Sequence, residues 1–148
     1  MIFRPLADSD IEAARQFWQE MPGLGLSSAD GPGPLSRFLS RNPGLSWSCF
    51  SDGKLVGTVL CGHDGRRGFL YHLAVADSFR GRGISSELLH RALKGLADSE
   101  IEKVHVFVLA ENSCGLAFWA AAARHGWSRR EDVLVFSRIN EAPQGVSV

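Results

Sequence analysis

Residues 46–76 hold three adjacent strand patterns, and this run constrains the fold more than any other feature of the sequence. The first two patterns, SWSCFS and KLVGTVLC, are separated by Asp52-Gly53, a dipeptide typical of a two-residue hairpin turn. A second turn, HDGRRG, leads to the third pattern, FLYHLAVA. Because strands joined by such short turns run antiparallel, the run predicts a three-stranded antiparallel meander.

The elements on either side of this meander are predicted from the spacing of apolar residues and from turn signals. In chain order they are a strand at 2–4, helices at 8–21, 35–42 and 84–96, a strand at 103–109, a helix at 114–125 and a last strand at 133–139. The strand at 103–109 is mostly apolar and β-branched, so we expect it to be central in the sheet. Crossover connections after a meander predict an α/β (α+β) fold, whose mixed, mostly antiparallel sheet has helices on both faces.

The length and charge of the chain bound its organisation and its partners. At 148 residues it is long enough for one domain with its own core, which we expect at 1–139, followed by a C-terminal tail at 140–148. Sixteen Lys and Arg balance sixteen Asp and Glu, so no overall field favours nucleic acid or a membrane surface. Binding of a polyanionic ligand would therefore need a local cluster of basic side chains.

Cysteine usage and the N-terminal segment indicate a cytoplasmic protein. The three cysteines, Cys49, Cys61 and Cys114, are an odd number and lack the spacing of metal ligands, so we expect reduced thiols and no metal site. The segment MIFRPLADSD has no apolar signal region, and no apolar run approaches the roughly 20 residues of a membrane span. The sequence thus predicts no membrane partner.

Two arginines and two glycines, Arg80-Gly81-Arg82-Gly83, stand between the third meander strand and the helix at 84–96. We call these four residues the glycine-arginine turn. A helix that begins directly after a strand exposes unpaired backbone N–H groups and the positive end of its dipole, and glycines let an anion approach them. The turn predicts a pyrophosphate site, and the alternative is a solvated turn in which the glycines only supply positive φ. No Gly-Lys-Ser/Thr follows, which excludes a P-loop, and Ser86 replaces the third glycine of a dinucleotide fingerprint.

Two segments, LAVADSFRGRGISSELL and ENSCGLAFWAAAARHGW, resemble the cofactor-binding blocks of the GNAT N-acetyltransferase superfamily, of the small stand-alone bacterial type. The family pattern, Arg or Gln-x-x-Gly-x-Gly or Ala, reads here as Arg80, Gly83 and Ser85, with serine at the last position. The resemblance covers the order of elements from residue 1 to about 139. It implies a GNAT-like fold and an N-acetyltransferase with acetyl-CoA as cosubstrate.

The resemblance also implies which residues hold the cofactor. The backbone of Leu73, Ala74 and Val75 faces the pantetheine arm, and the pyrophosphate lies against Arg80, Gly81, Arg82, Gly83, Ile84 and Ser85. Asn112 matches the asparagine that contacts the cofactor arm, and it also suits the N-cap of the following helix. Trp119 is the last residue that the resemblance assigns to the cofactor site.

The general acid of the family is missing from its usual place. Relatives often carry a tyrosine on the late helix, but counting forward from Asn112 leads to Trp119, and counting back from Gly126 leads to Ala122. An indole N–H can donate a hydrogen bond but cannot act as an acid, and an alanine has no proton to give. Packing is therefore the alternative interpretation of Trp119.

The remaining catalytic candidates are Tyr71 and Glu111. Position 71 matches one where some relatives carry a catalytic histidine, so Tyr71 is a candidate acid, base or water-holding group, or else a half-buried strand aromatic. Strand alternation predicts that Tyr71 and His72 face opposite sides of the sheet, which favours a core role for His72. Glu111 follows the strand at 103–109 and is a candidate base or a favourable partner of the helix dipole.

The loop GLGLSSADGPGP at 23–34 corresponds to the acceptor wall of the family. Its Ser27, Ser28 and Asp30 either bind an ammonium group of the substrate or solvate the loop. We expect transfer of an acetyl group to a primary amine, on a small molecule or a protein N-terminus, by direct attack in a ternary complex. The two partners are then acetyl-CoA and the amine acceptor, without nucleic acid.

Two alternative functions remain at this point. One is a non-catalytic acyl-CoA-binding module, which the absence of the usual tyrosine keeps open. The other is an acyltransferase that uses a longer acyl donor. The sequence leaves open the acceptor, the general base and the oligomeric state, for which a homodimer is one option.

Overall fold

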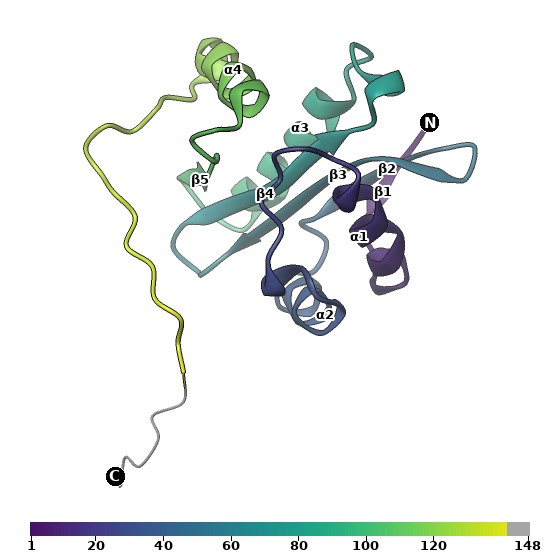
Figure 1. Cartoon of the computed structure of the whole chain (residues 1–148), viewed down its shortest axis with the longest axis horizontal. Helices are drawn as coiled ribbons and strands as arrows, with labels where there is room; N and C mark the ends of the chain where they lie inside the picture. The colour runs from purple at the N-terminus through teal and green to yellow at the C-terminus, as the bar shows by residue number, and fades with distance from the viewer. Residues whose placement is uncertain (142–148) are drawn as a thin grey trace, which may run out of the picture.

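A five-stranded mixed sheet forms the centre of the protein (Figure 1). The computed structural model describes residues 1–141 of the chain. The strands are β1 (Ile2–Pro5), β2 (Trp47–Ser51), β3 (Lys54–His63), β4 (Gly68–Val75) and β5 (Val104–Val106). They lie side by side in chain order, antiparallel from β1 to β4, and β5 is parallel to β4. The predicted meander, β2 to β4, is confirmed.

The β2–β3 hairpin turns at Asp52-Gly53, as its sequence predicts. Both residues have positive φ, +51° and +77°, which is the conformation that a type I′ turn requires. β3 is buried along almost its whole length and is the central strand. The expectation that residues 103–109 are central is wrong, because only Val104–Val106 form a strand and they lie at the edge of the sheet.

Helices cover both faces of this sheet. α1 (Ile11–Gln19) and α2 (Pro32–Arg41) pack on one face, in a buried cluster whose largest member is Trp18. α3 (Ile84–Asp98) packs on the opposite face, and α4 (Ser113–Ala121) contacts that core through Trp119. The predicted α/β class, with a mixed sheet between helices, is confirmed. None of the helices formed by residues 1–141 is long and apolar enough to cross a membrane.

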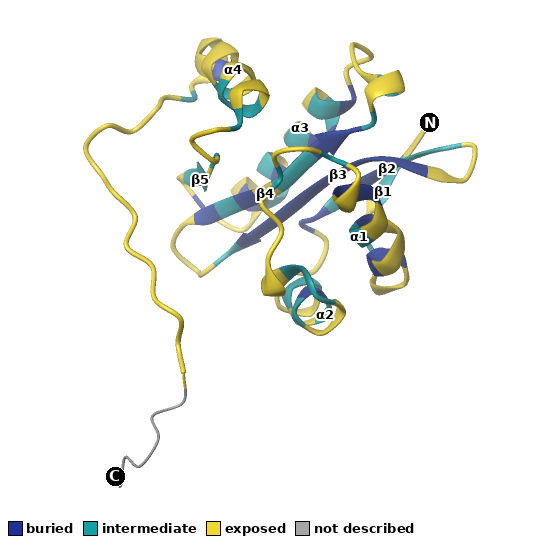
Figure 2. Ribbon diagram, in the orientation of Figure 1, coloured by how far each residue is buried: buried dark blue, intermediate teal, exposed yellow. Residues whose placement is uncertain are grey.

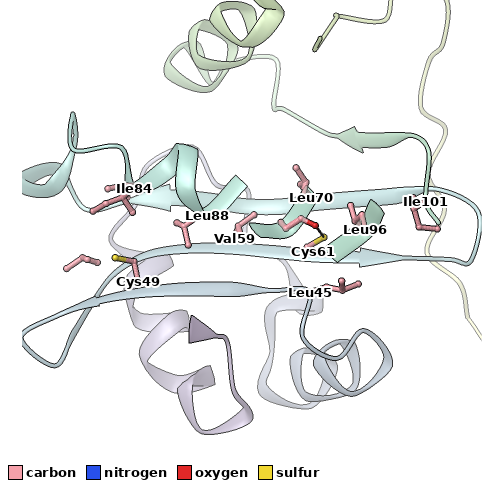
Figure 3. Close-up of a cluster of buried hydrophobic side chains, with 12 residues drawn as sticks. Leu45, Cys49, Val59, Cys61, Leu70, Ile84, Leu88, Leu96 and Ile101 are labelled. Carbon is pink, nitrogen blue, oxygen red and sulfur yellow. Dashed lines mark hydrogen bonds between the residues drawn. The ribbon is translucent and has the colours of Figure 1, made fainter. Parts of the chain in front are cut away.

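The larger core lies between α3 and the sheet (Figure 3). Leu88 and Leu96 of α3 are fully buried there against Val59 and Cys61 of β3. Burial raises the pKa of the Cys61 thiol to about 12, so this cysteine stays a neutral, unreactive core residue at physiological pH. β4, α3 and α4 thus all pack on one core.

The last predicted strand, at 133–139, does not form. These residues are extended and lie away from the sheet, where Val133, Leu134, Val135, Phe136 and Ile139 are 54–94% exposed (Figure 2). A strand needs a hydrogen-bonded neighbour, and in the described part of the chain the short β5 pairs only with β4. The domain limits at 1–139 remain a prediction, and most of the predicted tail at 140–148 lies outside the described residues.

Candidate active site

A cavity of about 560 Å³ opens where β4 and β5 part. The two strands pair only from Gly68 to Leu70 and from Val104 to Val106, whereas β4 continues to Val75. The cavity is lined by residues 70–75 of β4, by 106–109 beyond β5, by the loop at 21–25, by the glycine-arginine turn and by α4. Beyond Leu70, β4 therefore has a free edge that faces a hollow and not a neighbouring strand.

Leu73, Ala74 and Val75 form part of this free edge and line the cavity. The side chains of Ala74 and Val75 are buried in the two cores, so what they present to the cavity is mainly backbone. An unpaired strand edge offers alternating N–H and C=O groups, which match an extended ligand that carries amides. The three residues fit the pantetheine arm that the resemblance implies.

The glycine-arginine turn forms one end of the cavity. Gly81 and Gly83 have φ of +75° and +79°, and a Cβ added at either position would meet no atom within 4 Å. Gly83 is the N-cap of α3 and supplies no capping side chain, so the first amides of the helix have no side-chain partner there. Open space in front of unpaired amides fits a phosphate-bearing ligand.

The residues of the predicted pyrophosphate site do not all face this cavity. Arg80, Gly81 and Ser85 line it, and Arg80 is held by Asp77 at 3.1 Å. Arg82 instead stacks over Phe79, 4.8 Å from its ring centre. Ile84 is 2% exposed and packs in the α3 core, and Gly83 is not part of the cavity wall.

Asn112 connects α4 to the loop at 21–25. Its Oδ1 accepts a hydrogen bond from the Gly115 N–H at 3.0 Å, which is the predicted N-cap. Its Nδ2 donates to the Gly23 carbonyl at 3.1 Å, a contact that the sequence did not indicate. One side chain thus holds two walls of the cavity together. Trp119 lines the cavity and packs edge-on between Phe118 and Trp127, an arrangement typical of a structural aromatic.

Tyr71 and His72 lie on the same face of the sheet, and the expectation that they face opposite sides is wrong. The ring of Tyr71 meets Phe38 of α2 edge-on at 6.1 Å, and the ring of His72 lies 4.7 Å from that of Trp18 in α1. The cause is a β-bulge, since the β3–β4 register shifts here and His72 has a φ of +50°. Both residues line the cavity.

Of the two predicted catalytic residues, only Tyr71 reaches the cavity. Partial burial raises the pKa of its phenol above the usual range, so Tyr71 is protonated at neutral pH, as an ordinary tyrosine is, and can donate a hydrogen bond. Glu111 is exposed and does not line the cavity. Although Glu111 follows β5 in the chain, it lies outside the candidate site.

The predicted acceptor residues Ser27, Ser28 and Asp30 line a second cavity of about 210 Å³, beside α1. The larger cavity is bounded instead by Met21, Pro22, Gly23, Leu24 and Gly25, the residues that begin the same loop. Leu109 approaches this segment so closely that a Cβ at Gly25 would lie 3.0 Å from it. The loop does form a wall, but its apolar first part faces the larger cavity.

Asp30 lines the smaller cavity and contacts His72, which lines the larger one. Its Oδ1 lies 2.7 Å from His72 Nε2, across 42 residues of sequence. Its Oδ2 accepts from the Ser27 N–H at 2.9 Å, and its backbone carbonyl accepts from Arg15 Nε at 3.0 Å. No local sequence pattern indicates the pairing of Asp30 with His72, because it depends on how the loop packs on the bulge.

Comparisons with known proteins bear on the family and the fold of the chain. A model of the acetyltransferase (GNAT) family matches residues 11–123. The chain is 32% identical over 119 residues to the acetyltransferase ECA0875 of Pectobacterium atrosepticum, covering 80% of this chain and 84% of that protein. It also shares its fold with Rv2747 of Mycobacterium tuberculosis, solved in complex with CoA, at a TM-score of 0.69 and 21% identity over 93% of this chain and 77% of that one.

A further structural match is the aminoglycoside 6′-N-acetyltransferase AAC(6′)-IG of Acinetobacter haemolyticus. Its TM-score is 0.70 at 15% identity, and the match covers 95% of this chain and all of that one (100%). At such identities the two structural matches speak for the fold alone. The family match extends over most of the chain, and the chain therefore belongs to the acetyltransferase (GNAT) family, as an N-acetyltransferase with acetyl-CoA as its cosubstrate.

Proposed function

We propose that this enzyme binds acetyl-CoA in the larger cavity and transfers its acetyl group to a primary α-amine by direct attack in a ternary complex. The supporting observation is that one continuous cavity joins the glycine-arginine turn to the bulge at Tyr71 and His72. The turn would hold the pyrophosphate through Arg80, Gly81 and Ser85. The free edge of β4 would hold the pantetheine arm.

The bound thioester supplies an activated acyl group, and the residues of the chain orient it. A backbone N–H at Leu73 to Val75 can donate to the thioester carbonyl and stabilise the charge that develops on its oxygen. Tyr71, which is neutral at physiological pH and lines the cavity, would protonate the leaving sulfur. The loop at 21–25, which Asn112 holds in place, would form the wall beside the acceptor amine.

The placement of acetyl-CoA can be tested with the thiol of Cys114. Cys114 is exposed and lines the cavity, whereas Cys49 and Cys61 are buried. We expect a bulky maleimide to modify Cys114 alone in the native protein. Acetyl-CoA, which has no free thiol, should slow this reaction about tenfold at roughly ten times its Kd. Mass spectrometry of the labelled peptides measures both effects.

The control for this experiment is a variant that cannot hold the cofactor, Arg80→Ala, in which labelling should proceed at the same rate with and without acetyl-CoA. If calorimetry shows binding of acetyl-CoA to the natural protein but Cys114 is not protected, the carrier lies outside this cavity. The proposed placement would then be wrong, even though the family membership would stand.

The wall of the cavity also favours one class of acceptor. Among the described residues no Asp or Glu lines it, and its only charged or titratable side chains are Tyr71, His72, Arg80 and Cys114. A polycationic amine would leave its further ammonium groups without a carboxylate partner. An α-amine next to a neutral group, as at a protein N-terminus, avoids this cost, and its pKa of about 8 leaves more free amine than a lysine pKa of about 10.4.

A panel of acceptors tests this preference. We expect kcat/KM for a C-terminally amidated dipeptide with neutral side chains to exceed that for spermidine or an aminoglycoside by roughly 10–100-fold, which corresponds to one or two unpaired charges. Release of coenzyme A thiol is the measurement. Equal or higher kcat/KM with the polycations would contradict the assignment of the acceptor class.

A further inference from the structure

His72 occupies an unusual position for a strand residue. Its φ of +50° lies in the left-handed region, which a non-glycine residue adopts at a cost and which is often found at functional sites. The bulge turns its ring out of the ordinary alternation, toward the α1 and α2 face and into the cavity wall. The side chain is only 10% exposed, so its polar contacts are few and well defined.

The contact with Asp30 fixes which nitrogen of the ring carries the hydrogen. The Asp30 carboxylate lies 2.7 Å from Nε2. An ionised carboxylate can only accept a hydrogen bond, so Nε2 is the donor, and in the neutral ring Nδ1 holds the free lone pair. The same carboxylate would stabilise the ring after it takes up a proton.

Nδ1 is the nitrogen that remains available. No other described residue makes a hydrogen bond to it. Among residues 1–141, the only side-chain nitrogen or oxygen that is both buried and without a partner is Trp47 Nε1. Since Nδ1 has no partner and is not in that class, it is accessible from outside the protein. His72 lines the larger cavity, and we infer that Nδ1 is the ring nitrogen that a bound acceptor would meet.

The surroundings of this pair hold it in place. Trp18 lies against the ring at 4.7 Å and donates from Nε1 to Thr58 Oγ1 at 2.8 Å. Thr58 Oγ1 donates in turn to the His72 carbonyl at 2.9 Å, which fixes the bulge. The charged and titratable groups around the ring are Asp30, Arg15, which binds the Asp30 backbone carbonyl, and the neighbouring Tyr71.

We propose that His72 is the general base of the reaction and that Asp30 is its positioning residue, an inference that rests on the proposed function. His72 Nδ1 takes the N–H proton of the acceptor as the amine lone pair forms the N–C bond. The thioester C–S bond breaks with its electron pair on sulfur, and the proton returns to the sulfur through Tyr71 or water. An amide and a thiol result, and nothing is oxidised or reduced.

Two substitutions test this assignment. His72→Asn removes the base, and asparagine tolerates positive φ, so the bulge should persist. We expect its kcat to fall about 100–10,000-fold, the usual range for a lost general base, with the acetyl-CoA Kd from calorimetry unchanged. In Asp30→Asn the neutral amide orients the ring less firmly, so kcat should fall while the KM for the acceptor changes little. A merely structural role of Asp30 would lower stability without this split between kcat and KM.

A readout that needs no turnover accompanies the kinetics. In ¹⁵N NMR spectra of the free enzyme, His72 should be the Nε2–H tautomer, and Asp30→Asn should weaken this preference. A kcat within threefold of the natural enzyme for His72→Asn, or an Nδ1–H tautomer of His72 in the natural enzyme, would overturn the proposal. If the natural enzyme neither binds acetyl-CoA nor turns over, the proposed function fails instead, and these two failures are distinguishable.

Discussion

Replacing Gly83 with valine is expected to weaken coenzyme A binding at least about 100-fold while the sheet stays folded. Gly83 has a φ of +79° and is the N-cap of α3, and the space where its Cβ would lie is empty. We expect a branched side chain in that space to crowd an anion bound at the first amides of the helix. Losing about two charge-assisted hydrogen bonds, at roughly 1.5–3 kcal/mol each, accounts for this effect.

The backbone strain of this substitution has to be separated from the blocked site. Gly53 provides a matched control, because its φ is +77° and a Cβ there also meets nothing within 4 Å, but it lies in the β2–β3 turn. Gly53→Val and Gly83→Val should each lose about 1–2 kcal/mol of stability through left-handed strain. Only Gly83→Val should lose coenzyme A affinity in calorimetry. Equal affinity in the two variants would remove the glycine-arginine turn from the site.

The features that the sequence predicted best are those that depend on neighbouring residues. Asp52-Gly53 and the two glycines of the glycine-arginine turn have positive φ because a tight turn or a helix start requires it locally, and glycine meets that need. The hairpin and the strand–turn–helix junction could therefore be read from short segments. The larger cavity was not predicted, because it opens where the short β5 ends beside the free edge of β4, and the sequence pattern indicates a longer strand at 103–109.

The features that were missed depend on residues far apart in the chain. Alternation assumes a regular strand, and the bulge at His72, whose carbonyl accepts from a threonine hydroxyl 14 residues earlier on β3, breaks it. The pairing of His72 with Asp30 joins a strand to a loop 42 residues away. The apolar pattern at 133–139 is typical of a strand, but strand formation also needs a partner, and none lies beside it in the described part of the chain.

Thr58→Val is expected to lower both stability and activity, although it nearly preserves the shape of the side chain. Thr58 is fully buried, and its Oγ1 accepts from Trp18 Nε1 at 2.8 Å and donates to the His72 carbonyl at 2.9 Å. Valine leaves both groups without a partner, at about 1–3 kcal/mol for a buried polar group. We expect a loss of roughly 2–4 kcal/mol, or about 6–12 °C in Tm for a domain of this size.

Thr58→Ser separates the hydroxyl from the methyl group. Serine keeps the oxygen that joins α1 to the bulge and loses only a buried methyl, which costs about 1 kcal/mol. If the hydroxyl fixes the bulge, Thr58→Ser should keep most of the kcat, and Thr58→Val should lose much of it because the ring of His72 is no longer held beside Asp30. Thermal unfolding measures the loss of stability in each variant, and kcat measures the loss of activity. Equal losses in the two variants would assign Thr58 to packing alone and leave the conformation of His72 to the loop that carries Asp30.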